Sequence, residues 1–453
     1  MNFKAAYFIG VGGAGMSALA RYFKKDSKLV YGYDKANTRL TDQLESEGIV
    51  INYSDSIESI PTEIISLSKD ELLLVYTPAI PSNHNQLSHL KSLGHIPIKR
   101  AELLGKIIKN QSSLAVSGTH GKTSTTAILA HILDGTPSGC NAFLGGIAEA
   151  TNTNLYHSKS AEWTVVEADE FDRSFHHLYP THGLITSLDP DHLDIYKTHE
   201  AFIEGFRIFE SQITDKTLVS SSLQSTFPCA LSYGLTPNLD NYAYQILQTP
   251  SGTTCSLSLG NGSTKIRDIS IPLFGEHNLE NAVGAAALSH LAGASADIIK
   301  SRLESFPGIH RRFKIHVNKP SKVYIDDYAH HPTEIAKTIE AVRHHFPNRN
   351  LTVIFQPHLY SRTQDQLKGF CRELDKSDRV ILLPIYPARE KPIKGVNTQL
   401  ILDNISHTHA ELSTKNSIFE NLKAYSVDVI LTLGAGDIDT LVPAIKDFAS
   451  MDA

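Results

Sequence analysis

The sequence lacks the features of secreted, membrane-embedded and nucleic-acid-binding proteins. Its four cysteines lie far apart and form no C-x-x-C pair, so neither a disulfide framework nor a thiolate metal site is expected. No apolar run approaches the length of a bilayer-spanning helix, and the N-terminus has no signal-peptide layout. The net charge of −6 gives no general attraction to nucleic acid. These absences predict a cytoplasmic protein that interacts with neither membranes nor nucleic acid.

The length of 453 residues and the 41% share of hydrophobic residues predict several globular α/β domains. Segment 1–107 alternates short apolar runs with helical stretches, which predicts a parallel sheet flanked by helices. Segment 108–310 adds alternating polar and apolar residues around a Gly-Asn-Gly turn at 260–262, which is typical of antiparallel hairpins. Segment 311–453 returns to the α/β pattern. We therefore expect three domains with these boundaries.

A glycine-rich turn that ends in Lys-Thr is the most informative motif, because this pattern holds polyphosphates. An apolar strand precedes it and a helix is predicted over residues 125–133, which is the context that a phosphate-binding loop requires. Lys122 can neutralise the transferring phosphate, and the Thr123 hydroxyl can bind Mg²⁺. The first glycine of the strict motif falls at Val116, so an ordinary glycine-rich turn is the alternative. The predicted ATP-binding residues of this loop are Gly118, Thr119, His120, Gly121, Lys122, Thr123 and Ser124.

A second glycine motif follows the first predicted strand. Gly10, Gly12 and Gly15 match G-x-G-x-x-G, and Asp34 ends the next strand at the place of a ribose-binding acid in a dinucleotide fold. The motif alone suggests a nicotinamide-dependent dehydrogenase. The same turn binds any pyrophosphate, including that of a nucleotide-activated sugar, and a turn needed only for helix packing is a further alternative.

Acidic residues and a histidine after the phosphate loop indicate a metal site. Glu167 ends the predicted strand WTVV, and the DHLD segment with His192 follows the next strand. Carboxyl ends of parallel strands meet at one sheet edge, so both side chains are predicted to hold Mg²⁺ near the γ-phosphate. Taken alone, His192 is better explained as a hydrogen-bonded structural histidine, but the shared sheet edge favours the metal role.

Seven motifs in one order resemble those of the Mur ligase family of peptidoglycan precursor synthesis. They are GTHGKTSTT, EADEFDRSF, DHLD, GEHNLENAVGAA, FPGIHRRF, DDYAHHPTE and GAGDI, and they span nearly the whole chain. The resemblance implies an α/β fold in which Rossmann-like N-terminal and C-terminal domains flank a central P-loop ATPase-like domain. The segments FIGVGGAGMSALA and FQPHLYSRT are most similar to the branch that joins UDP-N-acetylmuramate to L-alanine.

The resemblance also assigns roles to matching positions. It implies that Asn278, Asn281, Arg312 and Asp327 complete the ATP site, and that Thr123, Glu167 and His192 surround the metal. The implied catalytic residues are Lys122, His192, Arg312 and His358. The implied amino-acid site contains His331, His358 and Arg362. The implied UDP-sugar site contains Gly10, Gly12, Gly13, Gly15, Asp34 and Arg100.

By the same resemblance, ATP with Mg²⁺ or Mn²⁺ converts the lactyl carboxylate of UDP-N-acetylmuramate into an acyl phosphate. The amine of L-alanine then attacks the acyl phosphate and releases phosphate. The amine must be neutral to attack, and His192, His331 and His358 are alternative bases. The implied partners are these small molecules, with the chain a monomer or a weak homodimer.

Three positions depart from the pattern of the family or of its branches. Ser187 replaces an asparagine and Leu359 stands where an arginine is common, which weakens detailed substrate assignments. Phe206 lies where members adding later amino acids carry a lysine, which favours the alanine-adding branch. The alternatives are a recycling ligase that attaches the tripeptide L-Ala-γ-D-Glu-meso-diaminopimelate, and a nucleotide-binding regulator without catalysis.

Overall fold

The computed structural model describes residues 3–189, 193–388, 390–406 and 409–451. The chain forms two compact units. The first unit contains Met1–Leu247, Thr254–Pro272 and Glu280–Pro307, and the second contains Gln248–Thr253, Leu273–Leu279 and Gly308–Ala453. None of the helices in the described residues is both long and apolar enough to cross a membrane.

The first sheet of the first unit is parallel, as predicted, with strand order β3-β2-β1-β4-β5. Its central strand β1 is buried at every position, which explains the continuous apolar run AAYFI. The strands are β1 (Ala5–Ile9), β2 (Leu29–Tyr33), β3 (Val50–Asn52), β4 (Leu72–Tyr76) and β5 (Pro97–Lys99). The helices are α1 (Ala14–Lys25), α2 (Arg39–Ser46), η1 (Ile57–Ser59), α3 (Thr62–Ile65), α4 (Asn85–Ser92) and α5 (Arg100–Ile108).

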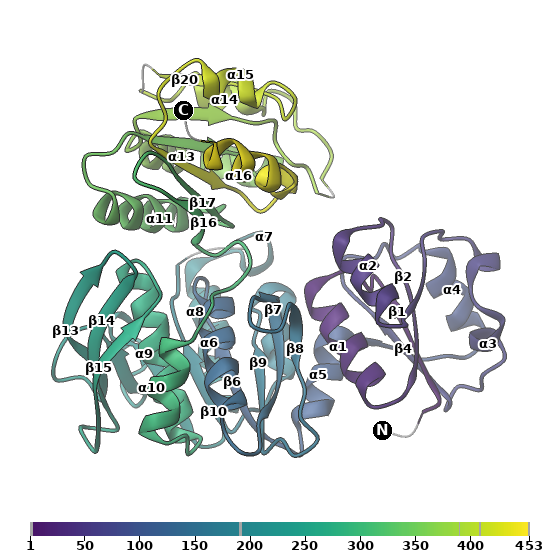
Figure 1. Cartoon of the computed structure of the whole chain (residues 1–453). Helices are drawn as coiled ribbons and strands as arrows, with labels where there is room; N and C mark the ends of the chain where they lie inside the picture. The colour runs from purple at the N-terminus through teal and green to yellow at the C-terminus, as the bar shows by residue number, and fades with distance from the viewer. Residues whose placement is uncertain (1–2, 190–192, 389, 407–408, 452–453) are drawn as a thin grey trace. The chain divides into compact units, whose positions relative to one another are not determined.

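The second sheet has the strand order β15-β14-β13-β12-β11-β10-β6-β9-β7-β8, and Figure 1 shows its strands β10, β6, β9, β7 and β8 side by side. Its strands are β6 (Ser112–Ser117), β7 (Cys140–Ala148), β8 (Thr153–Tyr156), β9 (Trp163–Glu167), β10 (His182–Ile185), β11 (Lys216–Ser220), β12 (Leu231–Gly234), β13 (Asn241–Thr249), β14 (Gly252–Leu259) and β15 (Thr264–Ile271). The helices are α6 (Lys122–Asp134), η2 (Phe171–His177), α7 (Leu193–Tyr196), α8 (His199–Gln212), η3 (Ser221–Leu223), α9 (Glu276–Leu291) and α10 (Ala296–Glu304).

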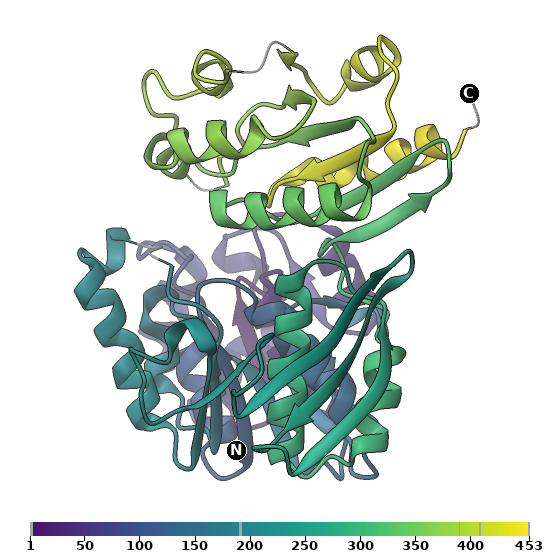
Figure 2. The ribbon, with the colours of Figure 1, turned by 90° about the vertical axis from the view of Figure 1, so that its left-hand side faces the viewer.

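The region predicted to contain hairpins holds the three long neighbouring strands β13, β14 and β15 (Figure 2). The predicted turn joins β14 to β15, and Gly260, Asn261 and Gly262 all have positive φ, which glycine and asparagine tolerate best. A second hairpin, formed by β7 and β8, was not predicted. It is antiparallel and lies at the other edge of the sheet.

The sheet of the second unit has the order β16-β17-β21-β18-β19-β20, with only β16 antiparallel to its neighbour among the pairings described. Apolar clusters cover both faces. The strands are β16 (Lys314–Asn318), β17 (Val323–Asp327), β18 (Leu351–Phe355), β19 (Arg379–Leu382), β20 (Ala410–Leu412) and β21 (Val429–Leu433). The helices are α11 (Pro332–His345), α12 (Tyr360–Asp365), α13 (Leu367–Leu374), α14 (Thr398–Leu402), α15 (Ile418–Lys423), η4 (Asp437–Leu441) and α16 (Val442–Ser450).

The α/β class is confirmed. Each of the predicted segments 1–107, 108–310 and 311–453 contains one of these sheets, but the first two segments lie largely in one compact unit. The three-domain division with those boundaries therefore stays a prediction.

Candidate active site

The glycine-rich loop connects β6, which ends at Ser117, to α6, which begins at Lys122, as the motif predicts. Gly118 and Gly121 have φ values of 125° and 82°, a region that glycine enters without strain. A Cβ at Gly118 would also collide with the Thr186 hydroxyl. These two glycines are therefore required by the backbone path of the loop.

The segment that follows β10 holds this loop in place. The backbone N–H of His120 donates to the Ser187 hydroxyl at 2.8 Å, and the N–H of Thr119 donates to the Ser187 carbonyl at 3.1 Å. The Thr119 hydroxyl donates to the Asp189 carbonyl at 2.7 Å. Ser187, which departs from the family pattern, thus fixes the loop through its own hydroxyl.

Lys122 is folded back onto a buried acid. Its Nζ lies 2.9 Å and 2.7 Å from the two carboxylate oxygens of Glu170 and donates to the Gly118 carbonyl at 2.5 Å. Burial raises the pKa of Glu170 to about 7 although Lys122 opposes this shift. Burial alone would lower the pKa of Lys122, but the nearby acids, Glu170 foremost, raise it. Sequence reasoning missed this pairing, and its only signal was an acid three residues after Glu167.

Glu167 and Thr123 lie together at the carboxyl edge of the sheet. The Thr123 hydroxyl donates to Glu167 Oε1 at 3.0 Å, and the Gly145 N–H donates to Oε2 at 2.9 Å. Burial raises the pKa of Glu167, so a cation beside this carboxylate would stabilise its charged form. Among the described residues, no group of three or more His, Cys, Asp or Glu side chains could hold a metal. His192, the third predicted ligand, lies outside the described residues.

The two asparagines assigned to the nucleotide are buried on α9. Asn281 Oδ1 accepts a hydrogen bond from the Thr125 hydroxyl at 3.2 Å and would lie 2.5 Å from a Cβ at Gly121. It therefore touches the phosphate loop. Asn278 Nδ2 donates to the Phe274 carbonyl at 2.9 Å, which is a local backbone contact.

The G-x-G-x-x-G motif at residues 10–15 contacts the side chain of Asp34. The Gly12 N–H donates to Asp34 Oδ2 at 2.7 Å, Gly10 has a φ of 89°, and Gly13 is the N-cap of α1. The motif follows β1. The strand order changes direction between β1 and β4, and ligands of open α/β sheets bind at such switch points. One Asp34 oxygen is thus engaged by the loop itself.

Arg100 joins this loop from α5. A Cβ at Gly15 would lie 2.8 Å from Arg100 Nη1, so the absence of a side chain at Gly15 makes room for the guanidinium. Arg100 Nη2 lies 3.9 Å from an oxygen of Asp169, which follows the strand that bears Glu167. The structure therefore brings together all residues predicted for the UDP-sugar.

In the second unit, Asp327 ends β17 with both oxygens engaged. They accept backbone N–H bonds from Phe313 at 2.6 Å and Ala329 at 2.7 Å. Burial raises the pKa of Asp327 to about 6, and the charge of Arg312 opposes the shift. The Arg312 guanidinium lies 5.0 Å from the ring centre of Tyr328. Asp327 therefore shapes the turn that presents Arg312.

His331 is the N-cap of α11. Its Nδ1 accepts from the Thr333 N–H at 3.3 Å, and its own N–H donates to Glu334 at 3.3 Å. This geometry matches the interpretation that the His-His pair shapes the start of the helix.

His358 and Arg362 lie together after β18. Arg362 Nη1 is 3.5 Å from His358 Nδ1, and the rings of His330 and Tyr386 lie 5.8 Å from that of His358. Leu359 has a φ of 72°, a conformation that strains a leucine and that recurs at functional sites. The structure thus places His358 and Arg362, both predicted for the amino acid, next to each other.

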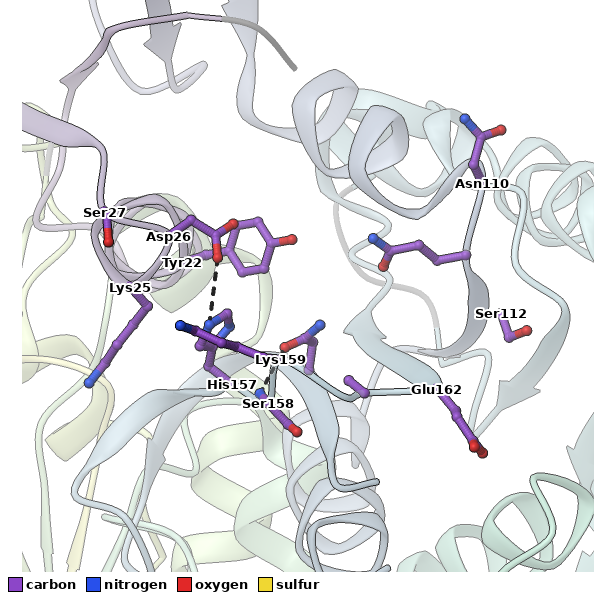
Figure 3. Close-up of a pocket in the computed structure, with 13 residues that line it drawn as sticks. Tyr22, Lys25, Asp26, Ser27, Asn110, Ser112, His157, Ser158, Lys159 and Glu162 are labelled. Carbon is purple, nitrogen blue, oxygen red and sulfur yellow. Dashed lines mark hydrogen bonds and ion pairs between the residues drawn. The ribbon is translucent and has the colours of Figure 1, made fainter. Parts of the chain in front are cut away.

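A separate hollow of about 660 Å³ contains none of the predicted site residues that the structure describes (Figure 3). Its lining includes Ser112, which begins β6, and Asn141, near the start of β7. The phosphate loop follows the other end of β6. The hollow therefore lies at the sheet edge opposite to the nucleotide loop.

Comparisons with known proteins cover nearly the whole chain. The models described as Mur ligase family catalytic domain, Mur ligase middle domain and Mur ligase glutamate ligase domain match residues 5–112, 116–289 and 311–436. The curated UDP-N-acetylmuramate–L-alanine ligase of Christiangramia forsetii is 44% identical, with 98% of this chain and 97% of that protein covered. The ligase of the same name from Cytophaga hutchinsonii is 39% identical, with 98% and 96% covered.

A solved structure shares the fold. The UDP-N-acetylmuramate-alanine ligase of Thermotoga maritima matches with a TM-score of 0.82 and 24% identity, covering 98% of this chain and 99% of that one. Curated relatives at about 40% identity extend over almost the full length of the sequence. The chain therefore belongs to the Mur ligase family.

Proposed function

We propose that the protein is an ATP-dependent ligase that joins the lactyl carboxylate of UDP-N-acetylmuramate to the amine of L-alanine and releases ADP and phosphate. The observation that carries this proposal is the phosphate loop with Lys122 and the adjacent Thr123–Glu167 pair, in a chain whose curated relatives bear the name of this reaction. ATP and UDP-sugars are cytoplasmic solutes, so we place the reaction in the cytoplasm.

The proposed chemistry proceeds in two steps. A lactyl carboxylate oxygen attacks the γ-phosphorus of ATP, the bond to the bridging oxygen of ADP breaks, and an acyl phosphate forms. The amine nitrogen then attacks the acyl carbon, the carbon–oxygen bond to phosphate breaks, and the amine passes a proton to a base. Lys122 and the N–H groups at the start of α6 stabilise the charge that develops on the transferring phosphate.

Thr123 and Glu167 are the residues that we propose to hold Mg²⁺. Their oxygens suit this ion, which prefers oxygen ligands and takes several of them from water and nucleotide phosphates, so few protein ligands are needed. The bound ion would act as a Lewis acid on phosphate oxygens. Without a bound ion, the Thr123 hydroxyl and the Gly145 N–H hold the Glu167 carboxylate in its orientation.

Arg362 and His358 are proposed to receive L-alanine. A guanidinium offers two parallel N–H donors, which matches the α-carboxylate of the amino acid. His358 stacks on Tyr386 and lies beside Arg362, so its ring has a defined place next to the proposed carboxylate site. His192, His331 and His358 stay open as bases for the amine.

Release of phosphate from ATP with Mg²⁺ and UDP-N-acetylmuramate tests the function directly. L-alanine, glycine, L-serine and the tripeptide L-Ala-γ-D-Glu-meso-diaminopimelate are compared as acceptors, and the product is identified by mass. We expect L-alanine to have the highest kcat/KM. A preference for the tripeptide would assign the recycling reaction instead. Inactivity with every acceptor in a protein that binds ATP would favour a regulator without catalysis.

Arg362→Ala is expected to raise the KM for L-alanine by about 30- to 150-fold, because a charge-assisted pair to the carboxylate is worth about 2–3 kcal/mol. The KM for ATP should stay unchanged in steady-state assays. Arg372→Ala is the matched control, since Arg372 is 73% exposed in the same unit and its partner Glu373 keeps Lys376. Equal KM values for L-alanine in both variants would remove Arg362 from the amino-acid site.

A further inference from the structure

The β7–β8 hairpin contacts the helix that bears the first glycine motif. Asn154 lies on β8, at the edge of the second sheet, and its side chain is completely buried. Its Nδ2 donates to the Ala14 carbonyl at 2.6 Å and to the Ser17 hydroxyl at 2.8 Å. Ala14 is the first residue of α1 and lies inside the glycine motif. Asn154 thus binds the backbone of the loop proposed to hold the UDP-sugar pyrophosphate.

Arg21 fixes the orientation of this amide. Arg21 Nη1 donates to Asn154 Oδ1 at 2.5 Å, while Nε and Nη2 donate to the Glu47 carboxylate at 2.9 Å and 2.8 Å. A guanidinium can only donate, so the amide oxygen must face Arg21 and the amide nitrogen must face Ala14. Arg21 is 2% exposed. The Asn154 amide is therefore buried with a single possible orientation.

The same helix is attached to the hairpin at its other end. Tyr22 packs on Phe143 with ring centres 5.2 Å apart and meets the His157 ring edge-on at 5.6 Å. His157 Nε2 lies 3.6 Å from Asp26, which caps α1, and Figure 3 shows this pair beside the hollow. Helix α1 is thus held to the hairpin at both ends, as their proximity in Figure 1 also shows.

The hairpin also supports the proposed metal site. Gly145 lies on β7, and its N–H orients Glu167, as described above. One pair of strands therefore holds both the turn at Ala14 and the carboxylate at Glu167.

We propose that Asn154 is a positioning residue that sets the glycine loop of α1 for the pyrophosphate of the UDP-sugar, on the same hairpin that orients Glu167. The inference rests on the proposed function, because the identity of the bound pyrophosphate comes from it. Without the amide donor, the first turn of α1 loses a buried partner and the N–H groups of the loop lose their fixed direction.

Two variants at this position separate its two roles. Asn154→Ala removes donor and acceptor, whereas Asn154→Asp keeps an acceptor for Arg21 but removes the donor to Ala14. We expect both variants to raise the KM for UDP-N-acetylmuramate about tenfold, and its Kd measured by calorimetry without ATP by a similar factor. The KM values for ATP and L-alanine should change less than about twofold.

Asn241→Ala is the matched control. Asn241 is also a buried asparagine of the first unit. Its Nδ2 donates to the Ser232 carbonyl and its Oδ1 accepts from the Gly260 N–H, and the alanine variant loses both hydrogen bonds. It contacts the hairpin turn at 260–262 instead of α1. We expect a lower melting temperature in this variant with an unchanged KM for the UDP-sugar.

Several outcomes would overturn the inference. One is a wild-type KM and Kd for the UDP-sugar in a folded Asn154 variant, and another is an equal rise of all three KM values. If neither Asn154 variant folds, the same comparison of KM values is made with Ser17→Ala, which removes one acceptor of the Asn154 amide. An unchanged KM for the UDP-sugar in that variant would then overturn the inference. Wild-type protein that neither binds UDP-N-acetylmuramate nor turns it over would contradict the proposed function itself, which is a separate result.

Discussion

Lys122→Ala is expected to lower kcat by at least about a hundredfold, on the scale of removing one donor that stabilises a transition state. The amine of Lys122 lies at the start of α6 beside the loop that is proposed to bind the β- and γ-phosphates. No other lysine of the loop can replace it. Steady-state turnover at saturating ATP, UDP-N-acetylmuramate and L-alanine measures the effect.

A loss of folding must be separated from this loss of chemistry. Lys122→Ala leaves the Glu170 carboxylate buried without its cation, and breaking such a pair costs about 3–5 kcal/mol. Adding Glu170→Gln removes the buried charge, so the double variant should regain thermal stability without regaining turnover. Lys109→Ala, an exposed lysine of the same unit, is the control for charge alone. Near-normal turnover in folded Lys122→Ala would refute the assignment of the phosphate loop.

Glu167→Gln is expected to raise the Mg²⁺ concentration needed for half-maximal activity and to lower kcat/KM for ATP by at least about a hundredfold. The amide lacks the charge that attracts the ion, and changes even in the surroundings of metal ligands cost about 10- to 100-fold. The fold should persist, because the amide oxygen can still accept from the Gly145 N–H while the Thr123 hydroxyl accepts from the amide nitrogen. Activity as a function of Mg²⁺ concentration provides the measurement.

The control for this variant lies just before the other end of the same strand. Glu162 precedes the first residue of β9, at the end opposite to Glu167, and its side chain is exposed. Glu162→Gln makes the same chemical change away from the proposed site and should leave the Mg²⁺ dependence unchanged. Binding of Mn²⁺ in the presence of ATP, followed by electron paramagnetic resonance, gives a readout without turnover. Equal Mn²⁺ affinity in wild type and Glu167→Gln would exclude Glu167 as a ligand.

The sequence predicted the buried strands, because β1 is a continuous apolar run and β9 carries the apolar pair Val165 and Val166 between clear breaks. The hairpin β7–β8 was missed for a physical reason. Gly145 and Asn154 are poor strand residues by composition, and their places depend on partners distant in sequence, Glu167 and α1. Local periodicity carries no information about such partners.

The candidate site was predictable to a similar extent. Motif spacing located the phosphate loop and Glu167, since both follow directly from strand ends and glycines. Motif spacing did not reveal that Glu170 forms an ion pair with the amine of Lys122, or that Asp34 accepts a hydrogen bond from the Gly12 N–H. Those contacts depend on the side-chain conformations in the folded protein, which no pattern of residue types specifies.

The placement of β8 bears on how the chain can be divided. This short strand ends the second sheet, and α1 from the first segment packs against it. A fragment that starts at β6 would remove α1 from the edge strand β8 and leave Asn154 in water, and exposed edge strands template association between molecules. We therefore expect such a fragment to aggregate, whereas residues up to the end of α10 remain monodisperse as one piece. The smallest part of the chain that we expect to fold by itself then contains both sheets of the first unit, and not one sheet with its helices.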